Sequence, residues 1–333
     1  MDKSMYKGVY VFIEQREGMI QNVAFELLTK ARELADTLNE KVYAILLGDK
    51  IADKAIECVY FGADTVLCVD APELKEYITE PYAQAVCQLV KEYHPSILLI
   101  GATTIGRDLG PRVSARLGTG LTADCTALAI SEDRDLMMTR PAFGGNLMAT
   151  ILCKEHRPQM STVRPGVMRI GVRDTHRKGD VKQVKITFDS SKFKVRLVKT
   201  VKEEKQLVDI TEANILVSGG RGVGNSEGFE MLRDFAKTIN AEVSSSRAMV
   251  DAGVMSHDRQ VGQTGKTVRP DVYFALGISG AIQHLAGMEE SEFIIAINKD
   301  KFAPIFQAAD LGIVGDVKQI IPLLIEKLKS LKS

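Results

Sequence analysis

The chain has no tryptophan and few aromatic residues, which make up 6% of its 333 residues. Its five cysteines lie far apart and form no C-x-x-C pair. This spacing argues against an iron–sulfur cluster, a zinc knuckle and a dithiol redox site. We therefore expect no metal site. We expect a reducing compartment, in which the cysteines stay free thiols and pack as small apolar side chains in the core. They are Cys58, Cys68, Cys87, Cys125 and Cys153.

Net charge and long apolar runs are missing as well. The 43 Lys and Arg residues balance 43 Asp and Glu residues, so the charge does not favour nucleic acid or a membrane surface as a partner. The N-terminal apolar run, residues 9–13, is short and is followed by Glu14 and Arg16, which predicts a strand and not a signal peptide. No run approaches the length of a membrane span. We expect a cytoplasmic protein without membrane insertion.

The composition that is present, 45% hydrophobic and 26% charged, is typical of globular proteins, and the length suggests two domains. In the first part, short apolar runs alternate with segments of helical periodicity. The expected strands are 8–13, 42–47, 65–69 and 96–100, and the expected helices are 23–38, 51–59, 81–92 (opened by Pro81) and 105–117. This alternation predicts an α/β domain with a doubly wound parallel sheet, whose ligands would lie at the C-terminal strand ends.

From residue 121 the pattern changes to shorter apolar runs between turn residues. Strands expected at 128–130, 136–139, 147–153 and 159–163 predict antiparallel hairpins added to the sheet. Segment 140–146, RPAFGGN, is dense in turn formers. It is either a hairpin loop or a rigid contact to a cofactor or a partner subunit.

Segment 172–205 is basic, but it contains no nucleic-acid motif. Apolar and basic residues alternate at 192–197, which predicts a half-solvated edge strand. We place the boundary here, between an N-terminal domain at 1–205 and a C-terminal domain at 206–333. The α/β alternation then restarts, with strands expected at 214–217, 272–276, 293–297 and 311–314 and helices at 227–239 and 316–331. A second doubly wound parallel sheet is therefore predicted.

The stretch 244–284 is rich in Gly, Ser, Thr and Gln. Within it, the strand expected at 272–276 leads into a Gly-rich turn and a helix start, with Ser279 as the N-cap. Free N–H groups and the positive end of a helix dipole favour phosphate at such a turn. The pattern predicts a cradle for a phosphate-bearing cofactor, although ordinary strand-to-helix turns share it.

Two common nucleotide motifs are incomplete in this region. The dinucleotide fingerprint that begins at Gly220 has Asn225 in place of its third glycine. The tripeptide 265–267, GKT, resembles the end of a P-loop, but Gln260 stands where that motif requires glycine. We therefore expect neither motif to act here.

Several short motifs follow one another in one order in the last third of the chain. They are SRA at 246–248, VDAG at 250–253, QVGQTGK at 260–266, GISGAIQHLAG at 277–287 and AINKD at 296–300, followed by PIF at 304–306 and ADLGIV at 309–314. Together they resemble the signature of the electron-transfer flavoprotein alpha subunit. The resemblance is close over the last third and looser over the first half.

The resemblance implies FAD as the cofactor. It implies Arg247 over the flavin ring, Thr264 near N5 and His284 near O2. The turn 279–281 would hold the pyrophosphate, and Asn298 and Asp316 would lie at the adenosine end. An electron carrier needs no acid–base catalysis, so no catalytic residue is expected. The full implied set of FAD contacts is Arg221, Ser246, Arg247, Gln260, Val261, Gly262, Gln263, Thr264, Gly277, Ser279, Gly280, Ala281, Ile282, Gln283, His284, Asn298, Asp316 and Val317.

Four of these residues also have simpler explanations. Arg247 could form an exposed ion pair, and His284 could be a core histidine that caps a helix. Arg221 could cover a helix end, and Asp316 could be only the N-cap of the last helix. The resemblance favours the functional role for all four.

The resemblance also implies a heterodimer with a smaller beta subunit and the transfer of single electrons between partner proteins. A simple carrier of this family takes electrons from acyl-CoA dehydrogenases to a membrane quinone reductase. In the bifurcating form, NADH reduces a second FAD in the beta subunit, and the electrons divide between ferredoxin and an acyl-CoA dehydrogenase. Segments 224–228 and 140–146 are more similar to the bifurcating group. The N-terminal domain would be scaffold and beta-subunit interface, and the C-terminal domain would swing on its linkers.

Three hypotheses from other classes remain. They are a nucleotide-binding stress-type module, a stand-alone NAD-dependent oxidoreductase and a scaffold that holds a partner flavoprotein. A purified protein without yellow colour would favour the first. Hydride transfer without flavin absorbance would favour the second.

Overall fold

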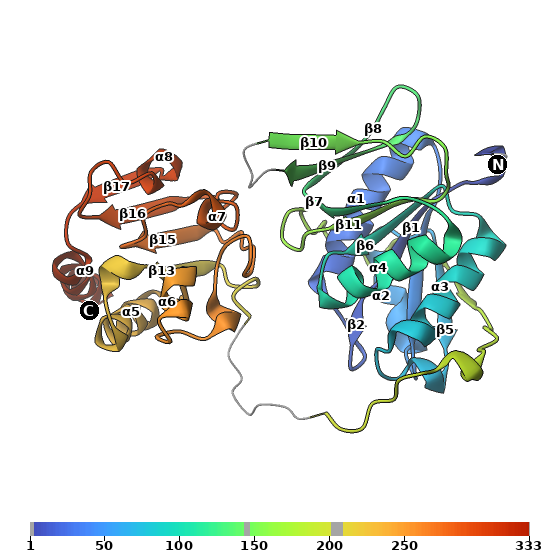
Figure 1. The fold of residues 1–333 in the computed structure, drawn as a ribbon, viewed down its shortest axis with the longest axis horizontal. Helices are drawn as coiled ribbons and strands as arrows, with labels where there is room; N and C mark the ends of the chain where they lie inside the picture. The colour runs from blue at the N-terminus through green and yellow to red at the C-terminus, as the bar shows by residue number, and fades with distance from the viewer. Residues whose placement is uncertain (1–2, 143–146, 201–208, 333) are drawn as a thin grey trace. The chain divides into compact units, whose positions relative to one another are not determined.

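The computed structural model describes residues 3–142, 147–200 and 209–332. Contacts within the chain divide it into two compact units, with the division near residue 202 (Figure 1). Each unit has its own main sheet and its own hydrophobic cores.

The first unit is built on a seven-stranded sheet in which all neighbouring strands are parallel. Its strands, in spatial order, are β12 (Asp180–Gln183), β5 (Thr65–Asp70), β4 (Val42–Gly48), β1 (Val9–Ile13), β6 (Ile97–Gly101), β11 (Gln159–Val163) and β7 (Leu121–Cys125). The central strands are nearly unbroken apolar runs because helices cover both faces of the sheet.

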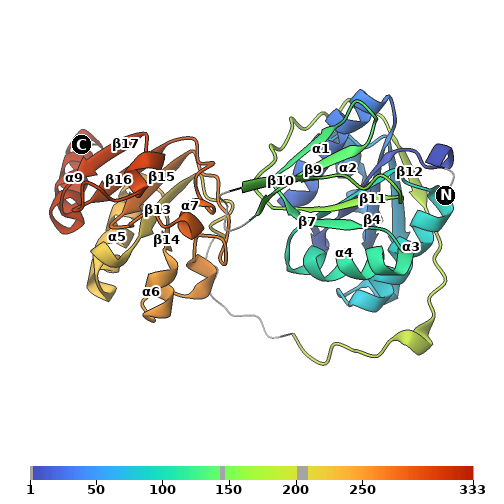
Figure 2. The ribbon, with the colours of Figure 1, turned by 45° about the horizontal axis from the view of Figure 1, so that its top comes forward.

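Four helices cover this sheet (Figure 2). They are α1 (Asn22–Leu38), α2 (Ala55–Tyr60), α3 (Thr79–Tyr93) and α4 (Thr104–Leu117). Val11 and Phe12 are neighbours in β1 and point to opposite faces. Val11 packs in one core with Leu28 of α1, and Phe12 packs in the other with Val86 of α3. The predicted doubly wound sheet is confirmed.

Two predicted helix starts are shifted. The helix α3 begins at Thr79, two residues before Pro81. The predicted helix 51–59 is a 3₁₀ turn, Ala52–Lys54, that leads into α2.

The predicted antiparallel strands are present, but two details of the prediction are wrong. β8 (Ala127–Ile130), β9 (Leu136–Ala142) and β10 (Leu147–Ile151) form a separate three-stranded antiparallel sheet. Residues 159–163 instead form β11, which lies parallel between β6 and β7 and is buried at all five positions. Of the segment 140–146, residues 140–142 belong to β9, and 143–146 lie outside the described residues.

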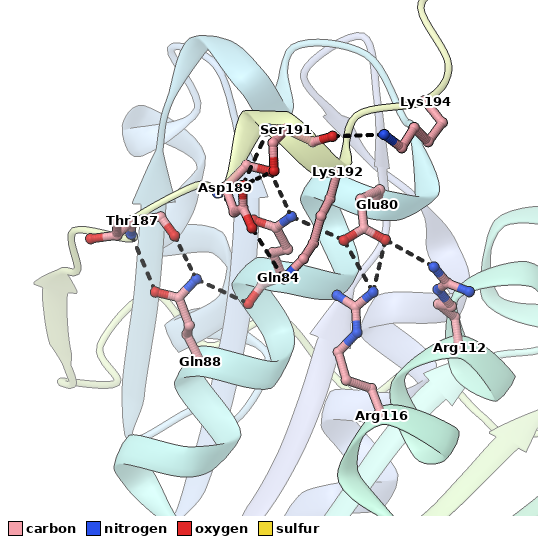
Figure 3. A network of polar contacts seen from close by, with 10 residues as sticks. All are labelled: Glu80, Gln84, Gln88, Arg112, Arg116, Thr187, Asp189, Ser191, Lys192 and Lys194. Atoms are coloured by element: carbon pink, nitrogen blue, oxygen red, sulfur yellow. Dashed lines mark hydrogen bonds and ion pairs between the residues drawn. The ribbon is translucent and has the colours of Figure 1, made fainter.

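The predicted edge strand at 192–197 is also wrong. The edge of the sheet is β12, and residues 193–197 have no regular secondary structure. Beyond β12, two glutamines of α3 bind the main chain of residues 187 and 189 (Figure 3). Gln88 bonds both the N–H and the C=O of Thr187, at 3.2 and 2.8 Å. Gln84 does the same for Asp189, at 2.8 and 3.2 Å.

The second unit contains a five-stranded sheet whose neighbouring strands are all parallel. The spatial order is β14 (Glu242–Ser245), β13 (Ile215–Gly219), β15 (Val272–Leu276), β16 (Ile294–Asn298) and β17 (Leu311–Val314). The second predicted parallel sheet is therefore confirmed, and the short strand β14 is the one that the prediction omitted.

Helices again lie on both sides of this sheet. α5 (Ser226–Ile239) and α9 (Val317–Lys332) share one core with Val217 and Leu276. The opposite core contains Tyr273 and Ala275 of β15 together with Ile305, the first residue of α8 (Ile305–Ala308). That second side of the sheet carries the polar loops described below.

Within the described ranges, no helix is both long and apolar enough to cross a lipid bilayer. In the same ranges, no three His, Cys, Asp or Glu side chains gather in a way that could hold a metal ion.

Candidate functional site

A pocket of about 450 Å³ opens in the second unit where strands β13, β14, β15 and β16 end. Carboxyl ends of parallel strands are the usual place for ligands in such folds. The pocket is lined by Arg221, Gly222, Ser246, Arg247, Ala248, Gln260, Val261, Gly262, Gln263, Thr264, Gly277, Ile278, Ser279, Ala281, Gln283, His284 and Asn298.

This lining brings together most of the predicted cofactor contacts from loops that are far apart in the sequence. Gly280, Ile282, Asp316 and Val317 are the predicted contacts that do not line it. Three lining residues were not in the predicted set: Gly222, Ala248 and Ile278. All three are direct neighbours of predicted residues, so widening each motif by one position would have included them.

Two glycines allow the loops after β13 and β15 to touch through their main chains. A Cβ atom on Gly222 would lie 2.7 Å from the Cα of Gly277, closer than such atoms approach. The Gly222 N–H donates to the Gly277 carbonyl at 3.0 Å. Gly277 also has a φ of +63°, in the left-handed region that favours glycine. No side chain can replace either hydrogen without moving a loop.

The turn 279–281 differs from the predicted helix start. The helix that follows, α7 (Ile282–Leu285), has four residues, and its N-cap is Ala281, with no capping side chain. Ser279 is therefore not the N-cap, and a helix this short has too few aligned peptides for a strong dipole. Among the described residues, the N–H groups of Ser279, Gly280 and Ala281 donate to no main-chain carbonyl. The turn itself supplies the free donors.

Main-chain bonds fix the loop 260–266 against its neighbours. The N–H of Val261 donates to the Ser245 carbonyl at 2.9 Å, and that of Gln263 donates to the Gln283 carbonyl at 2.7 Å. The Gln260 side chain donates to the Thr264 hydroxyl at 3.0 Å, which orients that hydroxyl within the pocket lining. Lys266 of the incomplete P-loop motif forms an ion pair with Asp209 at 2.8 Å, and it is not part of the lining.

The charged side chains of the lining are two arginines, and the lining contains no Asp or Glu. Arg247 pairs with Asp251 at 3.3 Å, but both side chains are about two-thirds exposed, at 67% and 64%. Such a pair is weak and leaves most of the guanidinium free. Arg221 is exposed and forms no ion pair with any residue that the structure describes. The electrostatics of the pocket therefore favour an anion.

His284 is buried in the pocket wall, with 7% of its surface exposed. Its Nε2 lies 3.0 Å from the hydroxyl oxygen of Tyr273. Burial lowers the pKa of His284 to about 4, against a smaller opposing effect of the Val261 carbonyl. The imidazole is therefore neutral at pH 7. Its Nδ1 has no hydrogen-bond partner among the described residues, which leaves one buried polar atom at the pocket for a ligand.

The side chains of Asn298 and Asp316 both form hydrogen bonds that stabilise the fold. Asn298 donates to the Ile278 carbonyl at 2.8 Å and so holds the loop after β15. Asp316 accepts from the Lys318 N–H at 2.9 Å at the start of α9 and pairs with Lys299 at 2.9 Å. The pKa of Asp316 lies below its usual range, chiefly because of Lys299. Asp316 therefore does cap the last helix, and Val317 is buried in the core beneath it.

Comparison with known proteins identifies the class to which this fold and pocket belong. Residues 9–189 match the family described as Electron transfer flavoprotein domain. Residues 209–289 match the family described as Electron transfer flavoprotein FAD-binding domain, which includes most of the pocket lining. The class is thus that of flavoproteins that carry electrons.

Three similar relatives extend the match to nearly the whole chain. The Electron transfer flavoprotein subunit alpha of Thermoanaerobacterium thermosaccharolyticum is 53% identical, over 98% of this chain and 99% of the relative. The Acryloyl-CoA reductase electron transfer subunit beta of Anaerotignum propionicum is 46% identical, over 100% and 98%. The LctC subunit of the Lactate dehydrogenase (NAD(+),ferredoxin) of Acetobacterium woodii is 44% identical, over 99% and 78%. The chain belongs to the electron transfer flavoprotein alpha subunit family, and it binds FAD.

The residues of the pocket fit this cofactor. The free N–H groups and the Arg221 guanidinium suit the negative charges of a pyrophosphate, and the Arg247 guanidinium suits the negative charge of a reduced flavin ring. The Thr264 hydroxyl and the unpartnered Nδ1 of His284 suit the polar edge of a flavin ring. The Gly222–Gly277 contact keeps side chains out of the space between two of the loops.

Proposed function

We propose that this chain holds one FAD in the pocket of the second unit and passes single electrons between a beta-subunit partner and other proteins. The observation that carries the proposal is a pocket at the carboxyl end of the sheet that contains two arginines, no carboxylate and a turn of free N–H groups. When bound, FAD supplies the one-electron chemistry. The protein binds, orients and tunes it.

We assign different parts of the pocket to different parts of FAD. The turn 279–281 donates N–H groups to the pyrophosphate, and Arg221 adds a free positive charge. Arg247 lies over the flavin ring, where its permanent charge favours the anionic reduced forms. Thr264 and His284 donate hydrogen bonds to the ring, while Asn298 and Asp316 lie toward the adenosine. Gly280 and Ile282 stay in the proposed set through their main chains, because their neighbours line the pocket, and Val317 stays in it as the neighbour of Asp316.

We further propose that the electron route is bifurcating. One relative is named as part of a lactate dehydrogenase that uses NAD⁺ and ferredoxin, and another as an electron transfer subunit of an acryloyl-CoA reductase. In this chain, electrons from NADH would reach a second FAD in the beta subunit. One electron would go to ferredoxin, and the other would pass through this chain to an acyl-CoA dehydrogenase. The N-terminal domain, proposed at 1–205, would provide the beta-subunit interface and the scaffold, and the domain at 206–333 would carry FAD.

The test is an anaerobic NADH titration of the chain co-expressed with its beta subunit, after the FAD content per heterodimer has been measured. Two FADs that are both reduced by NADH would support bifurcation. One FAD, reduced by an acyl-CoA dehydrogenase and not by NADH, would make the protein a simple carrier to a quinone reductase. A heterodimer whose FAD content is unchanged when the turn 279–281 is altered would contradict the proposed place of FAD.

A further inference from the structure

Tyr273 lies outside the pocket lining but contacts its wall. The residue is on β15, has no exposed surface and has its hydroxyl 3.0 Å from Nε2 of His284. The rings are 6.2 Å apart and tilted, so the contact is a hydrogen bond and not a stack. Either partner of this bond can hold the proton, and the surroundings decide which one does.

Two buried serines lie on the same face of the sheet as Tyr273. Ser218 of β13 and Ser244 of β14 are directly opposite each other in the ladder. Tyr273 is opposite Leu216, two residues before Ser218, so all three side chains share one face of the sheet. Burial raises the pKa of Tyr273, and the two serine hydroxyls act in the opposite direction. Neither serine Oγ makes a hydrogen bond of ordinary geometry within the described residues, so the bond to His284 is the one that the Tyr273 hydroxyl makes there.

The direction of the bond between Tyr273 and His284 follows from the chemistry of its two partners. A neutral imidazole nitrogen is a stronger base than a phenol oxygen, so the Tyr273 hydroxyl donates to Nε2 of His284. A neutral imidazole that accepts at Nε2 carries its proton on Nδ1. The Val261 main chain acts to raise the pKa of His284, as a carbonyl acceptor near the ring does. Nδ1 nevertheless makes no hydrogen bond of ordinary geometry within the described residues.

We propose that Tyr273 is a positioning residue that holds His284 in the Nδ1–H tautomer, so that the pocket presents one fixed, neutral N–H donor to an acceptor of its ligand. The inference rests on the proposed function only for the identity of that ligand, FAD. His284 then contributes an oriented dipole and no charge, and Arg247 and Arg221 are the charged groups of the lining.

The experiment is a long-range ¹H–¹⁵N correlation spectrum of the full chain with ¹⁵N-labelled histidine, which separates the two neutral tautomers. His284→Asn assigns the signal against the other four histidines. We expect the Nδ1–H pattern for His284 at pH 7 in the wild-type chain without FAD. In Tyr273→Phe, the pattern should shift toward Nε2–H, and FAD should bind about threefold to tenfold more weakly, as for one lost hydrogen bond.

Tyr10→Phe is the matched control, because Tyr10 is a buried tyrosine on a central strand of the first unit. It should leave the His284 signal and FAD affinity unchanged. An Nε2–H pattern in the wild type, or a pattern that Tyr273→Phe does not change, would overturn the inference. If the tautomer is as expected but added FAD leaves the His284 signal unmoved, the tautomer inference stands and the proposed place of FAD fails.

Discussion

At the residue scale, the function of the pocket depends on a few groups whose chemistry can be tested one at a time. Arg247 is the clearest case, because its guanidinium stays charged at every working pH. Its pair with Asp251 is too exposed to neutralise it.

Arg247→Ala should make the reduction potential of the bound FAD more negative. Reduction adds negative charge to the ring, and the variant removes a positive charge that stabilises it. A partly exposed charge contributes about 0.5–1 kcal/mol, which corresponds to about 20–40 mV for one electron. Anaerobic spectroelectrochemical titration measures the change. Arg233→Ala is the control, because Arg233 forms the same kind of exposed pair on α5, with Glu230. Equal potentials in Arg247→Ala and the wild type would contradict the role over the ring.

Ser279→Pro should reduce FAD affinity about tenfold or more. The substitution removes one free N–H from the turn, and a hydrogen bond to a charged phosphate contributes about 1.5–3 kcal/mol. Ser279→Ala keeps the N–H and separates the effect of the main chain from that of the hydroxyl. Fluorescence titration of the released FAD measures both variants. If proline and alanine had the same small effect, the phosphate would have to be bound elsewhere.

Much of the site could be predicted from the sequence because its motifs are local. The segments 246–248, 260–266 and 277–284 each place several lining residues in adjacent positions. What could not be predicted depends on contacts between distant strands. The bond from Tyr273 to His284 joins a strand interior to a short helix, and Tyr273 looks like any core residue in its apolar run.

At the scale of elements, the predictions succeeded where burial of a strand determines its run of apolar residues. They failed where side chains, and not a neighbouring strand, bind the main chain. Unbroken apolar runs such as β1 and β6 were found within a residue or two. Residues 192–197 alternate as a strand would, but the two glutamines of α3 bind the main chain just before them (Figure 3). Strand β11 was assigned to a hairpin because only the tertiary structure places it between β6 and β7.

Gln84→Ala with Gln88→Ala should speed amide hydrogen exchange at Thr187 and Asp189. Each glutamine bonds an N–H of this segment directly, and loss of one such bond is expected to speed local opening about threefold to tenfold. Native-state exchange followed by mass spectrometry reports on both sites. Lys91→Ala, on the same helix, is the control. Unchanged exchange would mean that the segment is held by other contacts.

The contact between α3 and α4 should show a pH dependence. Arg116 and Arg112 bond Glu80 at 2.8 and 3.1 Å, and bonds of this kind lower the pKa of Glu80 to about 2, with Arg116 the largest cause. A carboxylate with a lowered pKa stabilises the fold above its unfolded pKa of about 4.5. That stability is lost as the pH falls toward about 2.

Glu80→Gln should therefore destabilise the first unit by about 1–2 kcal/mol at pH 7. The difference from the wild type should shrink between about pH 4.5 and pH 2, because the wild-type carboxylate is protonated there. Urea unfolding across this range measures it, with the exposed Glu73→Gln as the control. A difference that stays constant with pH would exclude the ionised pair as its source.

At the scale of the whole molecule, two units with separate cores should unfold separately. FAD binds the second unit in our proposal, so only the transition of that unit should shift when FAD is added. At a hundredfold excess over Kd, the stabilisation is about 2.7 kcal/mol. Differential scanning calorimetry of the chain with and without FAD distinguishes the two transitions. A shift of both transitions together would show that the units are coupled.

The contact of Gly222 with Gly277 has a consequence for the speed of electron transfer. Atoms around a redox centre rearrange when its charge changes. The rearrangement is larger when the surrounding protein is flexible. Loops that touch main chain against main chain, with no side chain between them, have little room to shift. Groups that are oriented in advance need not turn when charge appears. With FAD in its proposed place, a stiff cradle of this kind would lower the reorganisation energy, so that an electron could enter and leave without a change in the shape of the pocket.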